Sequence, residues 1–562
     1  MEKKKFLKEL TGFTIMEAVI LVITVFPFFK HGLSGYAPDL QYHLLRIEGV
    51  KEAILSHDYP CRIYHFFYAD YGYGSPMFYP DIFLLIPAVF RIAGLSPLGA
   101  YKLFCSLLCI LIAASTYFSF RYISRNHLYS MVGTGLVCLS QFYLADLHDR
   151  VGMSEYQAYI FLPVLVAALY DLFVLEGKKI YLFGIAFCGL IFSHAIMTFL
   201  SAVFVILIFF TAVPFKIFRK KLSLKKIRSL IVCAVISFGV TAYYLVPMVE
   251  QLNWNTLKVS VPWAHPGDYM EPASVLFRMT GYFNYIAYVG IGLPIIMGAV
   301  LFAKDLFLPE KNPMAKLFLI LGILLFAVMT PVFPWKKLDD TIFNMIQFTY
   351  RIYPFAIIST VTSVVLFGSD ALKTKHRNLY ACAGIILLVL SCAFGIIQNR
   401  TVEISEDSLY LTEEYLSEND NITGSFEWLP LDIDEHVLYM TAPADVVVDY
   451  MYLLPFCNNG HGNYSFVTAD GERHWYLVPL VAYKGYKVNI TTADGNSKEL
   501  PIETELGKIC FTNDTGLSGV ITVEYKGTLI QKISDAVSVL TVLGLAMCFI
   551  NFHRKNKKKI SE

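Results

Sequence analysis

Charged residues are scarce in this sequence: Asp, Glu, Lys and Arg make up 16% of its 562 residues, whereas hydrophobic residues make up 56%. A soluble protein of this length needs far more polar surface to cover its core, so the composition excludes an ordinary soluble protein. The eleven cysteines include no CxxC pair, and this absence argues against a zinc or dithiol motif. The net charge of +1 conceals a strong asymmetry along the chain.

Apolar residues are grouped into long runs rather than spread at the period of a helix or a strand. About 20 apolar residues in an α-helix cross a hydrocarbon core of about 30 Å, so each run predicts a membrane-spanning helix. Twelve runs are present, at residues 13–29, 99–120, 128–145, 156–175, 180–195, 197–214, 229–247, 283–303, 315–332, 352–369, 379–397 and 530–551. A shorter run at 81–94 predicts a helix lying at the membrane interface. The expected fold is an α-helical polytopic membrane protein with about twelve transmembrane helices.

Lysine and arginine are distributed unevenly between the connections of these predicted spans. Connections on one side carry basic clusters such as those within 216–228 and 554–559, whereas short connections on the other side carry few. Basic connections stay in the cytoplasm, so the pattern predicts a multi-pass cell-membrane protein with both termini in the cytoplasm. Three longer segments, 31–98, 248–281 and 398–528, then lie outside.

The segment 398–528 has the composition of a soluble domain, with 21 acidic against 7 basic residues. Stretches of β-branched residues such as Val520–Val523, broken by Asp-Gly and Lys-Gly turns, predict a small β-rich extracytoplasmic domain. The chain therefore divides into a transmembrane domain at 1–397, whose outer loop 31–98 carries interfacial helices, the β-rich domain, and a last helix with a basic cytoplasmic tail at 529–562.

Polar side chains gather at the ends of several predicted spans that face the same side of the membrane. A centrally placed Asp costs on the order of 2.5–3.5 kcal/mol on insertion scales, so such residues serve a purpose or reach water. They are Asp39, Asp146, Asp149, Arg150, Glu155, His194, Gln347 and Arg351. Alternation of the spans places all of them on the outer side, where they predict a common site.

Each candidate also has a plain structural explanation. Asp39 could cap the helix that follows it. Asp146 and Asp149 are three residues apart and would share a helix face, where they could hold a divalent cation or simply meet water. His194 could be an interfacial histidine, and Arg351 could anchor its helix at the lipid headgroups.

Short motifs occur along most of the chain in a fixed order. They are Asp39–Leu44 (DLQYHL), Gly72–Pro80 (GYGSPMFYP), Asp149–Tyr156 (DRVGMSEY), Ser193-His194, Ile346–Arg351 (IQFTYR) and Leu480–Val488 (LVAYKGYKV). Together they resemble motifs of bacterial membrane proteins labelled 6-pyruvoyl-tetrahydropterin-synthase-related. The label points to soluble zinc enzymes with a histidine cluster, and the sequence has no such cluster.

The arrangement of these motifs among the spans is similar to that of the GT-C superfamily of membrane glycosyltransferases. The resemblance implies transfer of a sugar from a polyprenyl-phosphate donor to a cell-envelope glycan or lipid acceptor on the outer face. It implies that Asp39 is the general base or orients the acceptor. Glu155 and His194 are then further catalytic candidates, and the substrate-binding candidates are Asp146, Asp149, Arg150, Gln347 and Arg351.

The chemistry of sugar transfer accounts for these residue types. A carboxylate takes the proton of the acceptor hydroxyl, and a guanidinium pairs with the oxygens of the departing phosphate. A divalent cation, Mg or Mn, could assist at Asp146 and Asp149. Two departures leave that metal open: no DxD pair is present, and Thr349-Tyr350 stands where the family usually has Pro-Trp.

Two other functions stay open on the sequence. The protein could be a non-catalytic envelope assembly protein with the same fold, or a polytopic transporter or flippase. Transporters commonly show repeated halves and charges deep in their spans, and the sequence shows neither plainly. The expected partners are membrane lipids, a polyprenyl-phosphate-linked sugar and a glycan or lipid acceptor. The acidic outer domain argues against an anionic partner, and no nucleic acid is expected.

Overall fold

The computed structural model describes residues 2–29, 33–34, 39–68, 70–261, 263–274, 277–278, 280–281, 289–339, 341–402, 404–405, 411–418, 426–434, 445–460, 462–468 and 470–561. Contacts between Cα atoms divide the chain into two units. The first comprises Met1–Leu40, Leu95–Ser237 and Pro262–Thr412, and the second comprises Gln41–Gly94, Phe238–Val261 and Glu413–Glu562.

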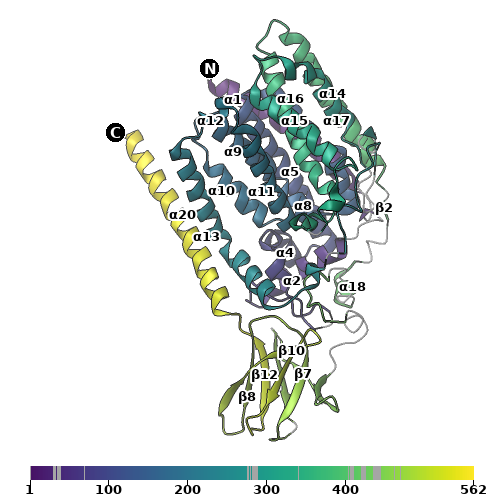
Figure 1. Ribbon diagram of the computed structural model, residues 1–562, viewed down its shortest axis with the longest axis vertical. Helices are drawn as coiled ribbons and strands as arrows, with labels where there is room; N and C mark the ends of the chain where they lie inside the picture. The colour runs from purple at the N-terminus through teal and green to yellow at the C-terminus, as the bar shows by residue number, and fades with distance from the viewer. Residues whose placement is uncertain are drawn as a thin grey trace. The chain divides into compact units, whose positions relative to one another are not determined.

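The first unit is helical, as its apolar runs predict (Figure 1). Its helices are α1 (Glu2–Val25), α5 (Pro97–Ser124), α6 (His127–Cys138), α7 (Gln141–Ala145), α8 (Met153–Ala158), α9 (Leu162–Phe173), α10 (Tyr181–Ile191), α11 (Ala195–Ala212), α12 (Lys216–Arg219), α14 (Leu293–Phe302), α15 (Pro313–Val328), α16 (Tyr353–Ala371) and α17 (Arg377–Arg400). Helix α13 (Leu224–Trp254) begins in this unit and ends in the second. A short pair of strands, β1 (Leu33–Ser34) and β2 (Ile404–Ser405), completes the unit.

Helix α5 illustrates how local sequence sets the ends of these helices. Ser96 is the N-cap, and its side chain accepts a hydrogen bond from the backbone N–H of Gly99. Pro97 follows at the first helical position, where its missing N–H costs nothing. The helix ends at Arg125 in a left-handed conformation, and the side chain of Asn126 then caps α6. Polar residues therefore end one apolar helix and start the next within two positions.

Eight helices in the described part of the chain are long and apolar enough to cross a membrane. They are Leu7–Phe29, Pro97–Ser124, Met153–Phe173, Ala195–Ala212, Leu224–Trp254, Thr349–Ala371, Arg377–Arg400 and Leu529–Arg554. A ninth candidate is a pair bent by 46°, His127–Cys138 with Gln141–Arg150. The structure thus confirms a helical membrane protein with several spans.

Three of the twelve predicted spans are shorter in the structure. Helix α10 has 11 residues and α15 has 16. At a rise of 1.5 Å per residue they cover roughly 16 Å and 24 Å, less than the roughly 30 Å of a hydrocarbon core. Helix α14 has 10 residues, and part of its predicted run lies outside the described residues. An apolar run in the sequence therefore predicts an apolar helix more reliably than it predicts a full crossing.

Helix α16 is buried along its whole length. Its Ser359 and Thr362 hydroxyls donate to carbonyl oxygens four residues earlier, at 2.7 and 2.6 Å, so both of these hydroxyls are satisfied within the helix. Gly322 of α15 permits a close helix contact, because a Cβ there would lie 2.2 Å from Oγ1 of Thr360. This buried helix begins two residues after Arg351.

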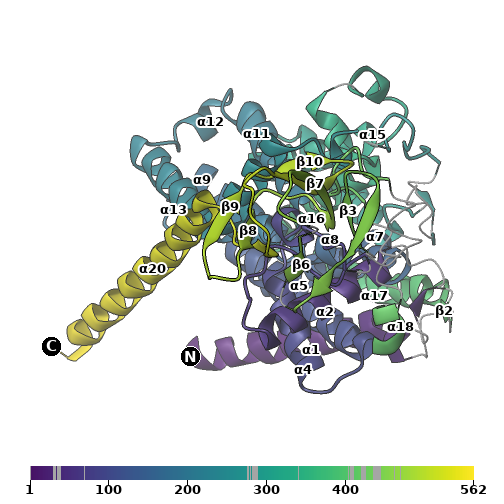
Figure 2. The same cartoon turned by 90° about the horizontal axis from the view of Figure 1, so that it is seen from below.

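The second unit contains a β-sandwich of two five-stranded sheets (Figures 1 and 2). The first sheet has the order β10 (Glu503–Glu505), β11 (Lys508–Asn513), β7 (His474–Val481), β3 (Asp445–Val448) and β4 (Tyr452–Pro455). The second has the order β5 (Cys457–Asn458), β6 (Asn463–Val467), β12 (Val520–Tyr525), β8 (Tyr486–Thr491) and β9 (Ser497–Leu500). All the strand pairs are antiparallel. The β-rich domain is therefore confirmed.

Aromatic rings join the two sheets. The ring of Phe466 in β6 lies 5.4 Å from that of Tyr476 in β7 and 6.3 Å from that of Phe511 in β11, measured between centroids. Burial alternates along β8 and β3, as the period of two of a strand with one buried face requires. The inner faces of the two sheets thus form one apolar core.

The rest of the second unit consists of helices α2 (Leu40–Leu55), α3 (Ser75–Phe78), α4 (Leu85–Ile92), α18 (Glu413–Glu418) and α20 (Leu529–Ser561), with α20 following the last strand (Figure 1). Residues 41–94 group with the β-sandwich, whereas the sequence suggested a loop of the transmembrane domain. The backbone N–H of Val481 donates to the carbonyl of Tyr71 at 2.9 Å, and Arg91 pairs with Glu413 at 2.8 Å. These long-range bonds explain the grouping.

Candidate functional site

A π-helix, η3 (Asp146–Arg150), connects α7 to α8 in the first unit. It ends at Val151 with a φ of 62°, a left-handed conformation that a β-branched residue disfavours. The N–H of Gly152 donates to the carbonyl of Asp146 at 3.1 Å and closes the turn. Irregular helical turns and strained residues of this kind are common at functional sites. The π-helix supplies Asp146 and Arg150 to a cluster of charged groups.

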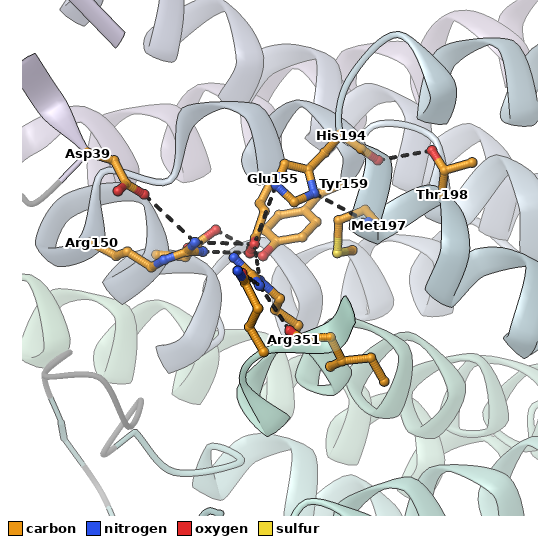
Figure 3. A network of polar contacts seen from close by, with 11 residues as sticks. Asp39, Arg150, Glu155, Tyr159, His194, Met197, Thr198 and Arg351 are labelled. Atoms are coloured by element: carbon orange, nitrogen blue, oxygen red, sulfur yellow. Dashed lines mark hydrogen bonds and ion pairs between the residues drawn. The ribbon is translucent and has the colours of Figure 1, made fainter. Parts of the chain in front are cut away.

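Arg150 holds two carboxylates at once (Figure 3). Its Nη1 donates to Oε2 of Glu155 at 2.5 Å and to Oδ1 of Asp146 at 3.1 Å, and its Nη2 donates to Oε1 of Glu155 at 3.2 Å. The two bonds to Glu155 form the paired arrangement in which guanidinium and carboxylate match best. The Nη2 atom also lies 3.8 Å from Oδ2 of Asp39.

Arg351 binds the same glutamate from a different segment of the chain. Its Nε donates to Oε1 of Glu155 at 2.6 Å. Glu155 is therefore a bridge between two guanidinium groups, and its side chain is only 1% accessible. A buried carboxylate between two cations compensates for their desolvation and fixes their separation.

A strained turn orients Arg351. Gln347 has a φ of 61° and a ψ of −50°, and the N–H of Phe348 donates to the carbonyl of Ile346 at 2.7 Å. This is a γ-turn of the rare form with positive φ. The Nη1 of Arg351 donates to that same carbonyl at 2.9 Å and to Oε1 of Gln347 at 2.6 Å. The turn and the guanidinium thus stabilise each other.

Aromatic rings line the two guanidinium groups. The ring of Tyr350 lies 5.1 Å from the Arg150 guanidinium carbon, and the ring of Phe348 lies 5.3 Å from that of Arg351. The two rings stack on each other, with centroids 5.1 Å apart. Such contacts favour a desolvated cation. Tyr350 thus offers its aromatic face to Arg150.

His194 approaches Glu155 from the start of α11. Its Nδ1 accepts a hydrogen bond from the N–H of Met197 at 3.3 Å, which caps the helix. An accepting Nδ1 places the proton of a neutral imidazole on Nε2. That Nε2 lies 3.8 Å from Oε1 of Glu155 (Figure 3). His194 therefore borders the cluster with a donor.

Asp39 is the accessible member of the cluster. Its side chain is 42% accessible, against 10% for Arg150 and 6% for Arg351. Desolvation by the surrounding protein atoms raises the pKa of Asp39 above its ordinary value, the charge of Arg150 opposes that rise, and Glu155 adds to it. Asp39 is thus a carboxylate of increased basicity next to a fixed guanidinium.

Two guanidinium N–H groups in the cluster are available as hydrogen-bond donors. Among the described residues, the Nη2 group of Arg351 and the Nε group of Arg150 make no hydrogen bond. An oxyanion would satisfy such donors. The cluster therefore combines an accessible base with guanidinium groups that retain capacity for an anion.

The structure does not favour the predicted cation site at Asp146 and Asp149. Both carboxylate oxygens of Asp146 are engaged, Oδ1 by Arg150 and Oδ2 by the hydroxyl of Tyr159 at 2.9 Å. A cation there would also meet the positive charge of Arg150. Within the described residues, no group of three or more His, Cys, Asp or Glu side chains is placed to hold a metal ion.

Most of the candidates from the sequence meet at this one place. The cluster joins Asp39, Asp146, Arg150, Glu155, His194, Gln347 and Arg351. Asp149 is buried on the same π-helix. The sequence did not point to Tyr159, whose hydroxyl fixes Asp146, or to Phe348 as a ring beside Arg351. The position of Phe348 and Tyr350 three residues and one residue before Arg351, within the motif Ile346–Arg351, was the available signal for these two rings.

Comparison with known proteins identifies a family. A family described as "Bacterial membrane protein YfhO" matches residues 71–422, more than half of the chain. Among solved structures, the chain is similar to the crystal structure of the Archaeoglobus fulgidus oligosaccharyltransferase in complex with zinc and sulfate. The identity is 13% and the TM-score 0.41, and the match covers 71% of this chain and 54% of the other, so the chain spans about half of that protein. No curated protein matches the chain. These comparisons do not support the pterin-synthase label.

Proposed function

Because the chain belongs to the YfhO family of bacterial membrane proteins, we propose that its buried arginine cluster serves a reaction at the membrane, the transfer of a sugar from polyprenyl phosphate to a hydroxyl group of a cell-envelope glycan or lipid. One observation carries this proposal. An accessible carboxylate, Asp39, lies 3.8 Å from Arg150, which Glu155 joins to Arg351. Base and anion-binding groups are thus held together.

The reaction needs both kinds of group. The acceptor oxygen attacks the anomeric carbon of the donor, a new carbon–oxygen bond forms, and the bond from that carbon to the phosphate oxygen breaks. The proton of the acceptor hydroxyl passes to the carboxylate of Asp39. The phosphate leaves with the bonding electron pair, and the uncommitted N–H groups of Arg351 and Arg150 stabilise its charge.

Glu155 has a positional role in this scheme. Its two oxygens accept bonds from both arginines, so it is the counter-ion of the guanidinium pair rather than an open base. By neutralising one of the two positive charges, it lets both arginines stay buried before the phosphate arrives. His194 extends the set of donors, because its Nε2 lies at the same edge of Glu155.

The membrane setting suits a lipid-linked donor. The arginines lie at the ends of candidate spans, with Arg351 near the start of Thr349–Ala371 and Arg150 at the end of the bent pair that precedes Met153–Phe173. A polyprenyl tail stays in the hydrocarbon while its phosphate meets polar groups at the ends of the spans. We place this reaction on the outer face, in accordance with the distribution of Lys and Arg in the sequence.

The test is a transfer assay with the full-length protein in lipid nanodiscs. Polyprenyl phosphates carrying radiolabelled glucose, galactose, mannose or N-acetylglucosamine are supplied with bacterial envelope material as acceptor. The Asp39→Asn variant keeps the shape of the side chain and removes its basicity, so transfer should fall at least about 100-fold, the usual contribution of a general base. The matched control is Asp268→Asn, an exposed carboxylate of the same unit, which should leave the rate unchanged.

Other outcomes would assign another function. Equal labelling of the envelope by wild type and Asp39→Asn would remove the proposed base. If no sugar is transferred from any donor, and the protein reconstituted in closed vesicles carries the lipid across the bilayer, a flippase is the better description. Absence of both activities in the wild type, with unchanged envelope assembly in Asp39→Asn cells, would favour the non-catalytic assembly protein.

A further inference from the structure

The hairpin between β3 and β4 carries an unusual turn. Asp449 and Tyr450 have φ values of 48° and 57°, and the N–H of Met451 donates to the carbonyl of Val448 at 2.9 Å. Two successive residues with positive φ define a type I′ turn, in which Asn-Gly is the ordinary sequence. A bulky residue in this conformation is strained by about 1–2 kcal/mol. The turn therefore holds Tyr450 in a position that local preference alone would not select.

The strained turn presents an aromatic platform. The ring of Tyr450 stacks on that of Trp475, with centroids 4.5 Å apart and planes 22° apart, and its hydroxyl donates to Glu505. One face of Tyr450 is thus supported by Trp475, while the residue as a whole is 64% accessible. Tyr452 belongs to the other face of the sheet, because its register aligns it with Val448 and the buried Tyr476, and its ring packs against His474 with centroids 6.1 Å apart. Tyr and Trp are enriched at binding surfaces, where one part of the ring packs on protein and the other part meets a ligand or water.

A polar group borders this platform. The ring nitrogens of His474 face two carboxylates, with Nδ1 2.6 Å from Asp449 and Nε2 2.8 Å from Asp470. The hydrogen bond to Asp449 and, to a smaller extent, the contact with Asp470 raise the pKa of His474 above its ordinary value, so the two carboxylates favour the imidazolium form. The other oxygen of Asp449 accepts from the N–H of Trp475 at 2.8 Å. Oriented carboxylates of this kind accept hydrogen bonds from hydroxyl groups.

From these observations we propose that Tyr450, Trp475 and Asp449 form a binding site for a neutral glycan of glucose-type pyranose units. A pyranose with equatorial hydroxyls has a flat face of C–H bonds, which stacks on the open face of Tyr450. Its hydroxyls at the ring edge donate to Asp449. The predominance of acidic residues in segment 398–528, 21 against 7 basic, disfavours an anionic glycan. The site does not depend on the transfer reaction proposed above.

Saturation-transfer-difference NMR on the full-length protein in detergent micelles tests this site. The probes are cellobiose, maltose and N,N′-diacetylchitobiose, with a hyaluronan tetrasaccharide as the anionic comparison. Wild type should saturate the C–H protons of at least one neutral probe and not those of hyaluronan. Tyr450→Asn removes the ring while Asn tolerates the left-handed conformation, so the turn is retained and affinity should fall at least about tenfold. Tyr450→Phe keeps the ring and should keep most of the binding.

Val467→Ala is the matched control, because Val467 is an exposed apolar residue on the other sheet. Binding should be unchanged in it. No signal from any neutral probe with the wild type, or equal signals from wild type and Tyr450→Asn, would overturn the proposal. A change of oligomeric state in Tyr450→Asn without any sugar signal would assign the platform to a contact between copies and would equally overturn it. The binding assay does not require sugar transfer. A negative binding result is therefore distinguishable from a failure of the proposed transfer reaction.

Discussion

Replacement of Glu155 by Gln removes the negative charge that joins two buried arginines. In the wild type, Glu155 accepts three hydrogen bonds from Arg150 and Arg351, at 2.5, 3.2 and 2.6 Å. A glutamine could accept from one guanidinium, but its amide N–H groups would face the donors of the other. Removing one partner of a buried ion pair costs about 3–5 kcal/mol, because the remaining charge is buried without compensation. We expect a loss of stability in this range.

Asp39→Asn is the informative comparison within the same cluster. Asp39 is 42% accessible and lies 3.8 Å from Arg150, so the ion pair contributes less than about 1 kcal/mol. Glu155→Gln should therefore lower stability strongly and Asp39→Asn barely, although both variants lose transfer. Glu176→Gln, whose exposed carboxylate pairs with Lys178, is the surface control and should show no measurable shift.

The assay is denaturant unfolding of the purified full-length protein in detergent, followed by circular dichroism. A double-mutant cycle between Glu155→Gln and Arg351→Gln should give a coupling of about 1–3 kcal/mol, as expected for residues in direct contact. A midpoint for Glu155→Gln equal to that of the wild type would refute the buried bridge. A loss in Asp39→Asn as large as in Glu155→Gln would refute the distinction between an open base and a buried counter-ion.

Three further measurements address Tyr350, the pH dependence and the orientation. Tyr350→Trp keeps an aromatic face over Arg150 and should retain transfer, whereas Tyr350→Leu should weaken it by about 0.5–2 kcal/mol of transition-state stabilisation, measured as kcat/KM. The raised pKa of Asp39 predicts that kcat/KM falls as the pH is lowered through a pKa above the ordinary aspartate value of 3.8, since only the ionised carboxylate accepts the proton. A fall in kcat/KM that occurs only at or below pH 3.8 would contradict this prediction. Cys457 is exposed in the β-sandwich and should react with a membrane-impermeant maleimide on intact cells. The Cys457→Ser variant is the control, and labelling of Cys457 only after permeabilisation would reverse the predicted orientation.

The sequence was sufficient to predict the helical membrane fold and the β-rich domain, because long apolar runs and period-two alternation are local signals. It was also sufficient to predict that the candidate residues lie near one another, since each is at the end of an apolar run on the same predicted side of the membrane. Which side chains of the cluster form hydrogen bonds with one another could not be predicted from the sequence. That Glu155 bridges Arg150 and Arg351 depends on contacts between residues about 200 positions apart, which no local pattern encodes.

The irregular backbone conformations at the cluster could not be predicted from the sequence either. The π-helix before Val151 and the γ-turn at Gln347 use residues with no special preference for those conformations. They persist because tertiary bonds, such as those of Arg351 to Ile346 and Gln347, determine them. The same applies to the division of the chain, since residues 41–94 join the β-sandwich through bonds such as that of Val481 to Tyr71. Local structure could be predicted from the sequence, whereas contacts between distant segments of the chain could not.

A cryo-electron-microscopy structure of the protein in nanodiscs containing polyprenyl monophosphate tests the central claim most directly. The phosphate should lie within hydrogen-bond distance of Arg351 and Arg150, with the carboxylate of Asp39 facing the space where an acceptor hydroxyl would stand. Density for the phosphate at another surface, with this cluster closed and unchanged, would contradict the proposed sugar-transfer centre.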